Sequence, residues 1–375
     1  MNTVVTILVT ILIFGLLIFI HELGHYIAAR IFHVGIKEFA IGMGPKLFSR
    51  RGKHNVFSVR ALPIGGFVSM VGEYADDREE DLDEADRGKT PLNTIPVWRR
   101  IVICLAGPLM NVLLGMLVMS LVVVSTPVLG STTVAQFVEG STSDASGLRP
   151  GDTILEVAGQ KIHVIIELNY VIAVDGIEPV DVLVERDGEE VLLRNVSFPV
   201  TDEDGVALAN RDFAVYRAEK TAGEVVYQAF WQSVATIELT VDSLVDTFRG
   251  RYGISALSGP IGIGEQVGEV IQSTEGAAAT LRNLASMMVL ISMSLGVFNL
   301  LPIPPLDGSK VLFSFLPRKY YGKLLQYERY GFLLLAVLLW IGVLDRPLTF
   351  LREGLIRLLW PICSWPVEQL LHFFH

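Results

Sequence analysis

The feature that most constrains this chain is the sequence His21-Glu22-Leu23-Gly24-His25, which directly continues the uncharged run from Val4 to Ile20. A run of this length and apolarity predicts a helix that enters a lipid bilayer. On a helix, H-E-x-x-H places two imidazoles one turn apart on one face, with the glutamate beside them. This is the geometry of a zinc site with its own general base. The sequence therefore predicts a metal site on a helix at membrane depth.

In a soluble protein H-E-x-x-H can occur by chance, so the alternative to a metal site is a purely structural role. In an apolar helix, each ionisable group at membrane depth costs about 2.5–3.5 kcal/mol on insertion scales. Three such groups lie within five residues here, and a bound cation would provide the compensation that they need. We therefore predict His21 and His25 as metal ligands and Glu22 as the catalytic residue.

The composition also favours a membrane protein, because 51% of the 375 residues are hydrophobic and the mean hydropathy is +0.48. Charged residues, 19% of the chain, concentrate after the first apolar run and in a central block, which indicates a soluble domain inserted into a membrane domain. The net charge of −10 gives no reason to expect nucleic-acid binding. The acidic run from Asp76 to Asp86 is interpreted as a solvated loop. Cys104 and Cys363 form neither a disulfide framework nor a cysteine-based metal motif.

Four apolar segments are candidate membrane spans: Thr3–Phe32, Ile101–Ser125, Ala285–Leu306 and the short Tyr330–Leu344. The first lacks a basic segment before it and a small-residue cleavage site after it, so we expect a retained span rather than a signal peptide. Basic residues follow the first span and separate the third from the fourth, which places both loops in the cytoplasm under the positive-inside rule. The N-terminus and the central domain are then expected on the opposite side.

This orientation places Asp307, late in the third span, at the depth of His21 and His25 and towards the cytoplasmic side. Asp307 lies in the stretch Asn299–Gly308, where three prolines break the helix and let a carboxylate turn inward. A catalytic zinc takes three protein ligands and leaves one position for water. We therefore predict Asp307 as the third Zn²⁺ ligand, the alternative being a polar residue at a helix end.

Two regions outside the predicted spans have β-like patterns. Val34–Met70 alternates short β-like runs, Ile36–Ile41 and Asn55–Leu62, with glycines, and predicts one or two hairpins beside the membrane site. A sheet edge there could receive an extended peptide, and the alternative is a plain cytoplasmic hairpin. Thr126–Val200 predicts a compact β-rich domain, and Gly223–Phe248 predicts an amphipathic helix on the membrane surface.

Three ordered motifs resemble the signatures of the site-2 protease family: His21 to His25, Gly107-Pro108-Leu109-Met110-Asn111, and Asn299 to Gly308. Ser258–Gly262 resembles a further stretch of the bacterial members, and Gly147–Asp152 resembles the G-L-x-x-G-D turn of PDZ domains. The order of spans with one inserted PDZ domain resembles the bacterial RseP/MmpA-like branch, although many RseP proteins carry two tandem PDZ domains.

The resemblance implies a polytopic α-helical membrane protein with about four transmembrane helices, membrane-associated β-hairpins and an inserted β-rich PDZ domain. Its expected parts are the first part of the membrane metalloprotease core (residues 1–125), the PDZ domain (126–200), a connecting region (201–284) and the second part of the core (285–375). The implied location is the bacterial inner membrane, with the PDZ domain on the extracytoplasmic side.

The resemblance also implies residue roles. His21, His25 and Asp307 would hold Zn²⁺, and Glu22 would take a proton from the attacking water and pass it to the leaving amine. Asn111 and Asn299 could position the substrate backbone or stabilise the oxyanion, and hydrogen bonding between helices is an equal alternative.

The implied activity is intramembrane cleavage of single-span membrane proteins in the lipid bilayer, such as anti-sigma-factor-like regulators or remnant signal peptides. An upstream site-1-type protease would first remove the exterior part of the substrate, and the PDZ domain would filter substrates by size or bind their tails. Two other classes stay open: a membrane-anchored PDZ scaffold with a structural or inactive zinc site, and a metal transporter. The intact Glu22 argues against the first, and the lack of a His-rich loop argues against the second.

Overall fold

The computed structural model describes residues 2–73, 86–203, 206–248, 260–274, 276–302 and 306–315, together with residues 337 and 354. The chain divides into two compact units. The membrane unit comprises Met1–Val118 and Ser255–Arg346, and the β-rich unit comprises Met119–Ile254 and Pro347–His375. Most of the β-rich unit thus lies in the sequence between the two segments of the membrane unit.

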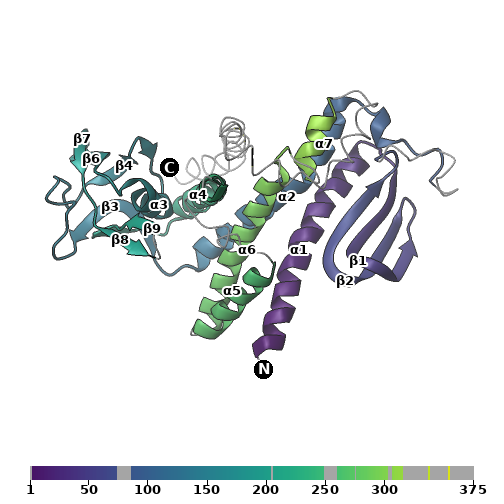
Figure 1. The fold of residues 1–375 in the computed structure, drawn as a ribbon, viewed down its shortest axis with the longest axis horizontal. Coiled ribbons are helices and arrows are strands. Elements are labelled where there is room, and N and C mark those ends of the chain that lie inside the picture. The colour runs from purple at the N-terminus through teal and green to yellow at the C-terminus, as the bar shows by residue number, and fades with distance from the viewer. Residues whose placement is uncertain are drawn as a thin grey trace. The chain divides into compact units, whose positions relative to one another are not determined.

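Three helices in the described part of the chain are long and apolar enough to cross a membrane. They are α1 (Asn2–Ile31), α2 (Val97–Ser125) and α6 (Ala277–Asn299), shown in Figure 1. They correspond to the first three predicted spans. The predicted fourth span, Tyr330–Leu344, lies outside the described residues except for Val337.

The third span differs from its prediction at both ends. α6 begins at Ala277 rather than Ala285, because the polar residues of its first turns are tolerated in a continuous helix. It ends at Asn299 rather than Leu306, because Pro302 follows closely and a proline does not continue a helix.

Close helix approaches shape the membrane unit. A Cβ atom at Gly24 of α1 would lie 2.3 Å from the carbonyl oxygen of Ala106 in α2, so the two backbones meet at a position that only glycine allows. On α6, a Cβ atom at Gly296 would lie 2.9 Å from the side chain of Val112 in α2. The helix α5 (Pro260–Ser273) lies beside α1 and α6 (Figure 1).

The strands β1 (Ile36–Arg51) and β2 (Val56–Met70) form a long antiparallel hairpin beside α1 (Figure 1). Both strands are longer than the predicted β-like runs, because the hairpin folds back on itself. Ala40, for example, has two partners in β2, Phe67 on one side and Ser58 on the other. The end of β2, from Gly66 to Met70, pairs with β1 on one side and is therefore an edge of the described sheet.

A small charge cluster ties the hairpin together at Glu38. Lys46 and Arg60 each lie 2.9 Å from its carboxylate, and Ser58 donates a further hydrogen bond. Burial by itself raises the pKa of Glu38, but these hydrogen bonds outweigh it and leave the pKa below its ordinary value. The carboxylate therefore stays charged and joins both strands.

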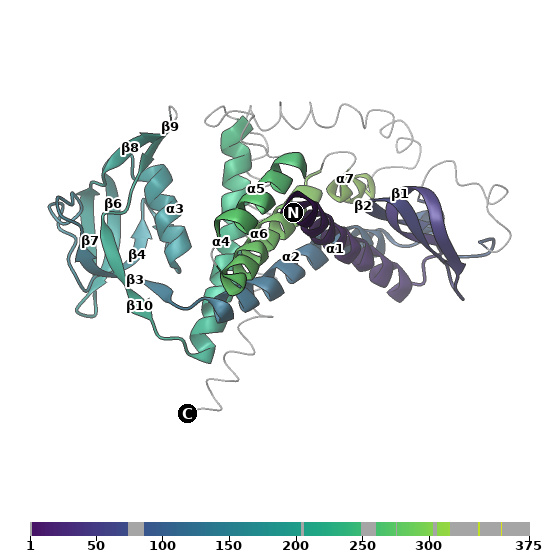
Figure 2. The same ribbon diagram turned by 90° about the horizontal axis from the view of Figure 1, so that it is seen from below.

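The β-rich unit is built on a six-stranded sheet with the strand order β10-β3-β4-β6-β7, in which β5 pairs with β4. Figure 2 shows helix α3 along the sheet. The elements are β3 (Leu129–Phe137), β4 (Thr153–Val157), β5 (Gln160–Lys161), α3 (Ile165–Asp175), β6 (Val180–Arg186), β7 (Glu189–Val196), β8 (Val200–Glu203), β9 (Val206–Ala209) and β10 (Phe213–Ala218). Because β10 pairs with β3, the sheet extends beyond the predicted domain end at Val200.

The turn Gly147–Asp152 is fixed by a buried ion pair. Arg186 at the end of β6 donates two hydrogen bonds of 2.7 Å to Asp152 and one of 2.9 Å to the carbonyl of Gly147. Asp152 is 1% exposed, and its hydrogen bonds raise the pKa of Arg186. Because a buried carboxylate needs a partner, this pair holds the turn against the sheet.

The predicted amphipathic helix exists as α4 (Ala222–Phe248), which belongs to the β-rich unit. Its Trp231 stacks on His163, with ring centroids 3.3 Å apart and planes 4° apart. Of the apolar residues in its pattern, Val234, Ile237 and Leu244 are buried and Trp231 and Val245 are partly buried. The helical spacing of apolar residues in this segment therefore predicted a face of the helix that is buried in the structure.

Candidate metal centre

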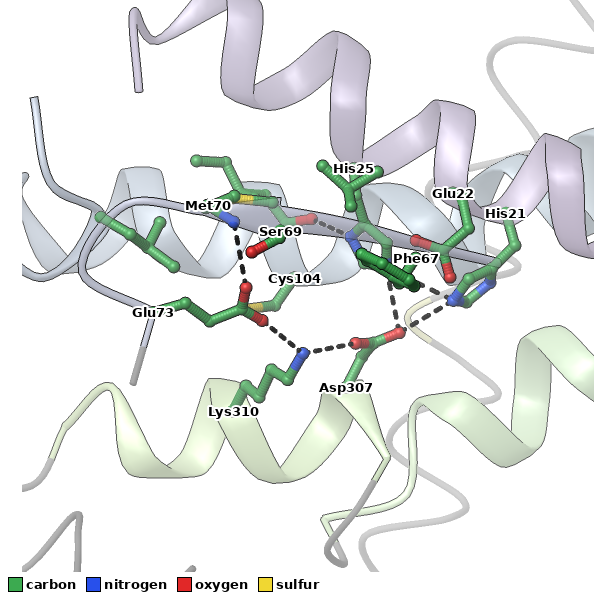
Figure 3. Close-up of a pocket in the computed structure, with 13 residues that line it drawn as sticks. His21, Glu22, His25, Phe67, Ser69, Met70, Glu73, Cys104, Asp307 and Lys310 are labelled. Atoms are coloured by element: carbon green, nitrogen blue, oxygen red, sulfur yellow. Dashed lines mark hydrogen bonds and ion pairs between the residues drawn. The ribbon is translucent and has the colours of Figure 1, made fainter. Parts of the chain in front are cut away.

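Three metal-ligating side chains meet in the membrane unit. His21 and His25 lie on α1, and Asp307 is the first residue of α7 (Asp307–Phe313). Asp307 Oδ2 lies 3.0 Å from Nε2 of His21 and 3.2 Å from Nε2 of His25, and the two Nε2 atoms are 3.3 Å apart. All three side chains are buried (Figure 3). The structure thus brings together three of the residues that the sequence nominated.

Local geometry explains this convergence. The two histidines are four residues apart on a continuous helix and therefore share one face. Asp307 begins α7, after the proline-rich segment that follows α6. A Cβ atom at Gly308 would lie 2.2 Å from the carbonyl oxygen of Leu300, so the start of α7 meets the end of the α6 segment at a position that only glycine allows.

Helix α2 supports the ring of His25 from behind. Nδ1 of His25 donates a hydrogen bond of 2.8 Å to the carbonyl oxygen of Ile103, because a carbonyl oxygen only accepts. In the neutral imidazole this bond places the proton on Nδ1 and leaves Nε2, on the side of the ring that faces Asp307, free to bind a cation. Gly107 faces the same ring, since a Cβ atom there would lie 2.3 Å from Nε2 of His25. The space for the imidazole is therefore created by a glycine.

A partly buried ion pair adjoins Asp307. Nζ of Lys310 lies 3.7 Å from Oδ1 of Asp307 and 3.1 Å from Oε1 of Glu73, which follows β2 (Figure 3). Oε2 of Glu73 accepts the backbone N–H of Met70 at 3.2 Å. Sequence reasoning missed Lys310 and Glu73. The spacing of Lys310, three residues after Asp307, was a usable signal, because residues three apart on a helix are neighbours.

The cluster borders a cavity of about 320 Å³. Glu22 lines this cavity beside the two histidines (Figure 3), together with the end of β2 from Phe67 to Met70. Three carboxylates and one ammonium group among its lining residues leave a formal charge of −2, which a divalent cation would neutralise. Two imidazole nitrogens and one carboxylate oxygen are also a donor set that suits Zn²⁺. The residues present therefore fit a zinc ion.

The two candidate asparagines lie in different surroundings. Asn111 of α2 is buried, and its amide nitrogen lies 3.2 Å from Nδ1 of His21. Asn299 donates a hydrogen bond of 2.9 Å to the carbonyl of Leu295, within its own helix, and does not line the cavity described above. The structure therefore brings Asn111 to the cluster and leaves Asn299 outside it.

Fold and site together define a class of protein. The membrane unit contains three helices able to cross a bilayer, and it holds a buried His-His-Asp group beside a glutamate. This combination is that of an integral membrane protein with the donor set of a hydrolytic metal centre.

Comparison with known proteins gives the family. The model of peptidase family M50 matches residues 9–341, and the chain belongs to this family, the site-2 proteases. A Fusobacterium nucleatum protein named as zinc metalloprotease FN1322 is 32% identical over 320 residues, which are 83% of this chain and 88% of that protein. Metalloprotease MmpA of Caulobacter vibrioides is 31% identical over 334 residues, 80% and 83% of the two chains.

A further relative is the regulator of sigma-W protease RasP of Bacillus subtilis, 26% identical over 392 residues, 83% and 89% of the two chains. With these relatives, the predicted resemblance and the predicted zinc cofactor are confirmed. The chain is a zinc metalloprotease and a multi-pass bacterial membrane protein.

Proposed function

We propose that this chain is an intramembrane endopeptidase that cuts single-span segments of other membrane proteins. In this proposal His21, His25 and Asp307 hold Zn²⁺, and Glu22 is the catalytic base. The observation that carries it is the convergence of these four side chains on one buried cavity, in a unit built from helices long enough to span a bilayer.

The chain's own residues divide the chemistry between them. When bound, Zn²⁺ supplies Lewis acidity to the attacking water and to the scissile carbonyl. Glu22 accepts the proton of the attacking water and later donates it to the leaving amine. Lys310 faces Oδ1 of Asp307, which keeps Oδ2 directed at the two histidines. Burial of the cluster excludes bulk water and strengthens each of these electrostatic contacts.

The substrate needs a place to unfold, because a membrane helix hides its peptide bonds in internal hydrogen bonds. The edge Gly66–Met70 of the hairpin runs along the cavity beside Glu22. Two backbone donors show which way this edge faces. The N–H of Val71 bonds to Gly35 on the side of β1, and the N–H of Met70 bonds to Glu73 on the other side. We propose that an unwound substrate segment adds to this edge as a strand.

The β-rich unit is proposed to act as a PDZ domain on the extracytoplasmic side. The sheet, the helix α3 and the pinned turn Gly147–Asp152 support this assignment. It would admit substrates whose exterior part an upstream site-1-type protease has removed, or bind their tails. The name of the RasP relative, a regulator of sigma-W protease, supports regulators as substrates, and remnant signal peptides are a second substrate class. A fourth span and a cytoplasmic-side active site complete the proposal.

The test is cleavage of a tagged single-span substrate in cells, comparing the wild type with Glu22→Gln at matched expression and zinc content. Cleavage by the wild type alone supports the proposal and the role of Glu22. Equal cleavage by both proteins would mean that another protease is responsible. If neither protein cuts a panel of spans while zinc stays bound, the scaffold alternative replaces the protease.

A further inference from the structure

One polar side chain next to the cluster is buried without being used by the proposed chemistry. Asn111 lies on α2 with no exposed surface, and the atom placed as its amide nitrogen is 3.2 Å from Nδ1 of His21. Its Oδ1 atom is buried and has no hydrogen-bond partner among the described residues. A buried amide oxygen without a partner costs stability, so its placement calls for an explanation.

The other histidine shows what the cluster requires. Nδ1 of His25 carries a proton, because it bonds to the carbonyl oxygen of Ile103, and its Nε2 is left as a bare lone pair. His21 also directs Nε2 at Asp307 and places Nδ1 on the far side of its ring, next to Asn111. If His21 is to bind a metal through Nε2, its Nδ1 must likewise be the protonated nitrogen and needs an acceptor.

An asparagine amide supplies that acceptor in one of its two orientations. Its oxygen and nitrogen ends have nearly the same shape, and which end faces a neighbour follows from the hydrogen bonds available. With the oxygen facing His21, the Nδ1–H of His21 gains an acceptor and Oδ1 gains a donor. With the nitrogen facing His21, Nδ1 would have to accept, the proton would move to Nε2, and metal binding would be blocked.

We infer that Asn111 is a positioning residue whose amide oxygen fixes the tautomer and the orientation of His21. This inference rests on the proposed ligand role of His21. It also separates Asn111 from the substrate, because Asn111 lies behind the imidazole and does not line the cavity with Glu22. Its backbone is held in place by Ser292 of α6, whose hydroxyl donates a hydrogen bond of 2.7 Å to the carbonyl oxygen of Asn111.

The test measures Zn²⁺ affinity of the purified full-length protein in detergent, by competition with a chelator of known affinity. Asn111→Leu keeps the approximate volume and removes the acceptor, and we expect zinc binding to weaken about 10–100-fold. Asn111→Asp replaces the NH₂ group with a second carboxylate oxygen, so an acceptor faces His21 in either orientation, and zinc affinity should not fall more than about threefold below that of the wild type. Val112→Ala, at a buried neighbour on the same helix, controls for packing and should bind zinc like the wild type.

The aspartate variant separates the two amide orientations. Loss of affinity in Asn111→Leu with retention in Asn111→Asp supports the inference. Equal loss in both variants, or wild-type affinity in Asn111→Leu, overturns it while leaving the ligand assignment intact. If His21→Ala binds zinc as well as the wild type, the ligand assignment of the proposed function fails, and the inference fails with it.

Discussion

The sharpest consequence of the geometry is that a single methyl group at Gly107 should disable the metal site. The Cβ atom of Gly107→Ala would lie 2.3 Å from Nε2 of His25, 2.7 Å from Cε1 and 2.8 Å from Cδ2. Ordinary Cβ contacts begin at 3.4 Å, so the ring or the helix backbone must give way by about 1.1 Å. The clash falls on the nitrogen that is proposed to bind the metal.

This displacement is large for a metal site, where ligand distances are held to about ±0.2 Å. A ring that moves away from Gly107 also loses its hydrogen bond to the carbonyl of Ile103, which fixes its tautomer. A misplacement of about 1 Å typically costs about 100-fold in rate, or about 2.7 kcal/mol of activation free energy. We therefore expect Gly107→Ala to lose at least about 100-fold in cleavage rate and to bind zinc more weakly.

The assay is cleavage of the tagged single-span substrate, with zinc content measured on the same purified protein. Gly115→Ala is the matched control on α2, because its Cβ atom would meet the flexible end of Met293, Cε at 2.7 Å. A methionine side chain can adapt to such a contact, so this variant should keep most of its activity. Wild-type cleavage and zinc content in Gly107→Ala would refute the reasoning, since the ring could then not lie where the structure places it.

Two further predictions concern the substrate. Successive N–H groups of a strand point to opposite sides, so by alternation from Met70 and Val71 the N–H of Val68 faces the free edge of β2. Val68→Pro removes this N–H and should slow cleavage without loss of zinc. Val68→Ala controls for the buried side chain, and normal cleavage by Val68→Pro would contradict strand addition at this edge. Deleting Leu129–Ala218, which removes the whole sheet with β10, should permit cleavage of intact substrates if the β-rich unit is a size filter, whereas loss of all cleavage at normal zinc content would identify a recruiting domain instead.

The sequence predicted those parts of the molecule that depend on local patterns. Continuous apolarity located α1 and α2, and the alternating runs with glycines in Val34–Met70 located the β1–β2 hairpin. The juxtaposition of His21 with Asp307, 286 residues away, was reached only by adding an orientation argument to the motif. That argument worked because residues at the same depth in neighbouring spans can meet, and depth can be read from the position of a residue along each span.

The remaining features depend on pairings that no local pattern encodes. Glu73 and Lys310 are 237 residues apart, and each alone resembles an ordinary charged residue at the end of an element. The double pairing of Ala40 with Phe67 and Ser58 requires the hairpin to fold back, which a count of alternating residues does not reveal. The proline break after α6 was recognised as a break, but its effect on the end of the helix was not.

The glycines of the three motifs show why such motifs are more than lists of chemical groups. Gly24 lets α2 approach within van der Waals contact of α1, Gly107 leaves room for the ring of His25, and Gly308 lets the start of α7 lie against the carbonyl oxygen of Leu300. Each lies next to or near a residue nominated for chemistry, and each faces a backbone or a ligand ring rather than solvent. A metal site at the meeting point of separate helices needs short distances between backbones as much as it needs ligands. The glycines of these motifs therefore indicate where the helices pack closely enough to bring the proposed ligands together.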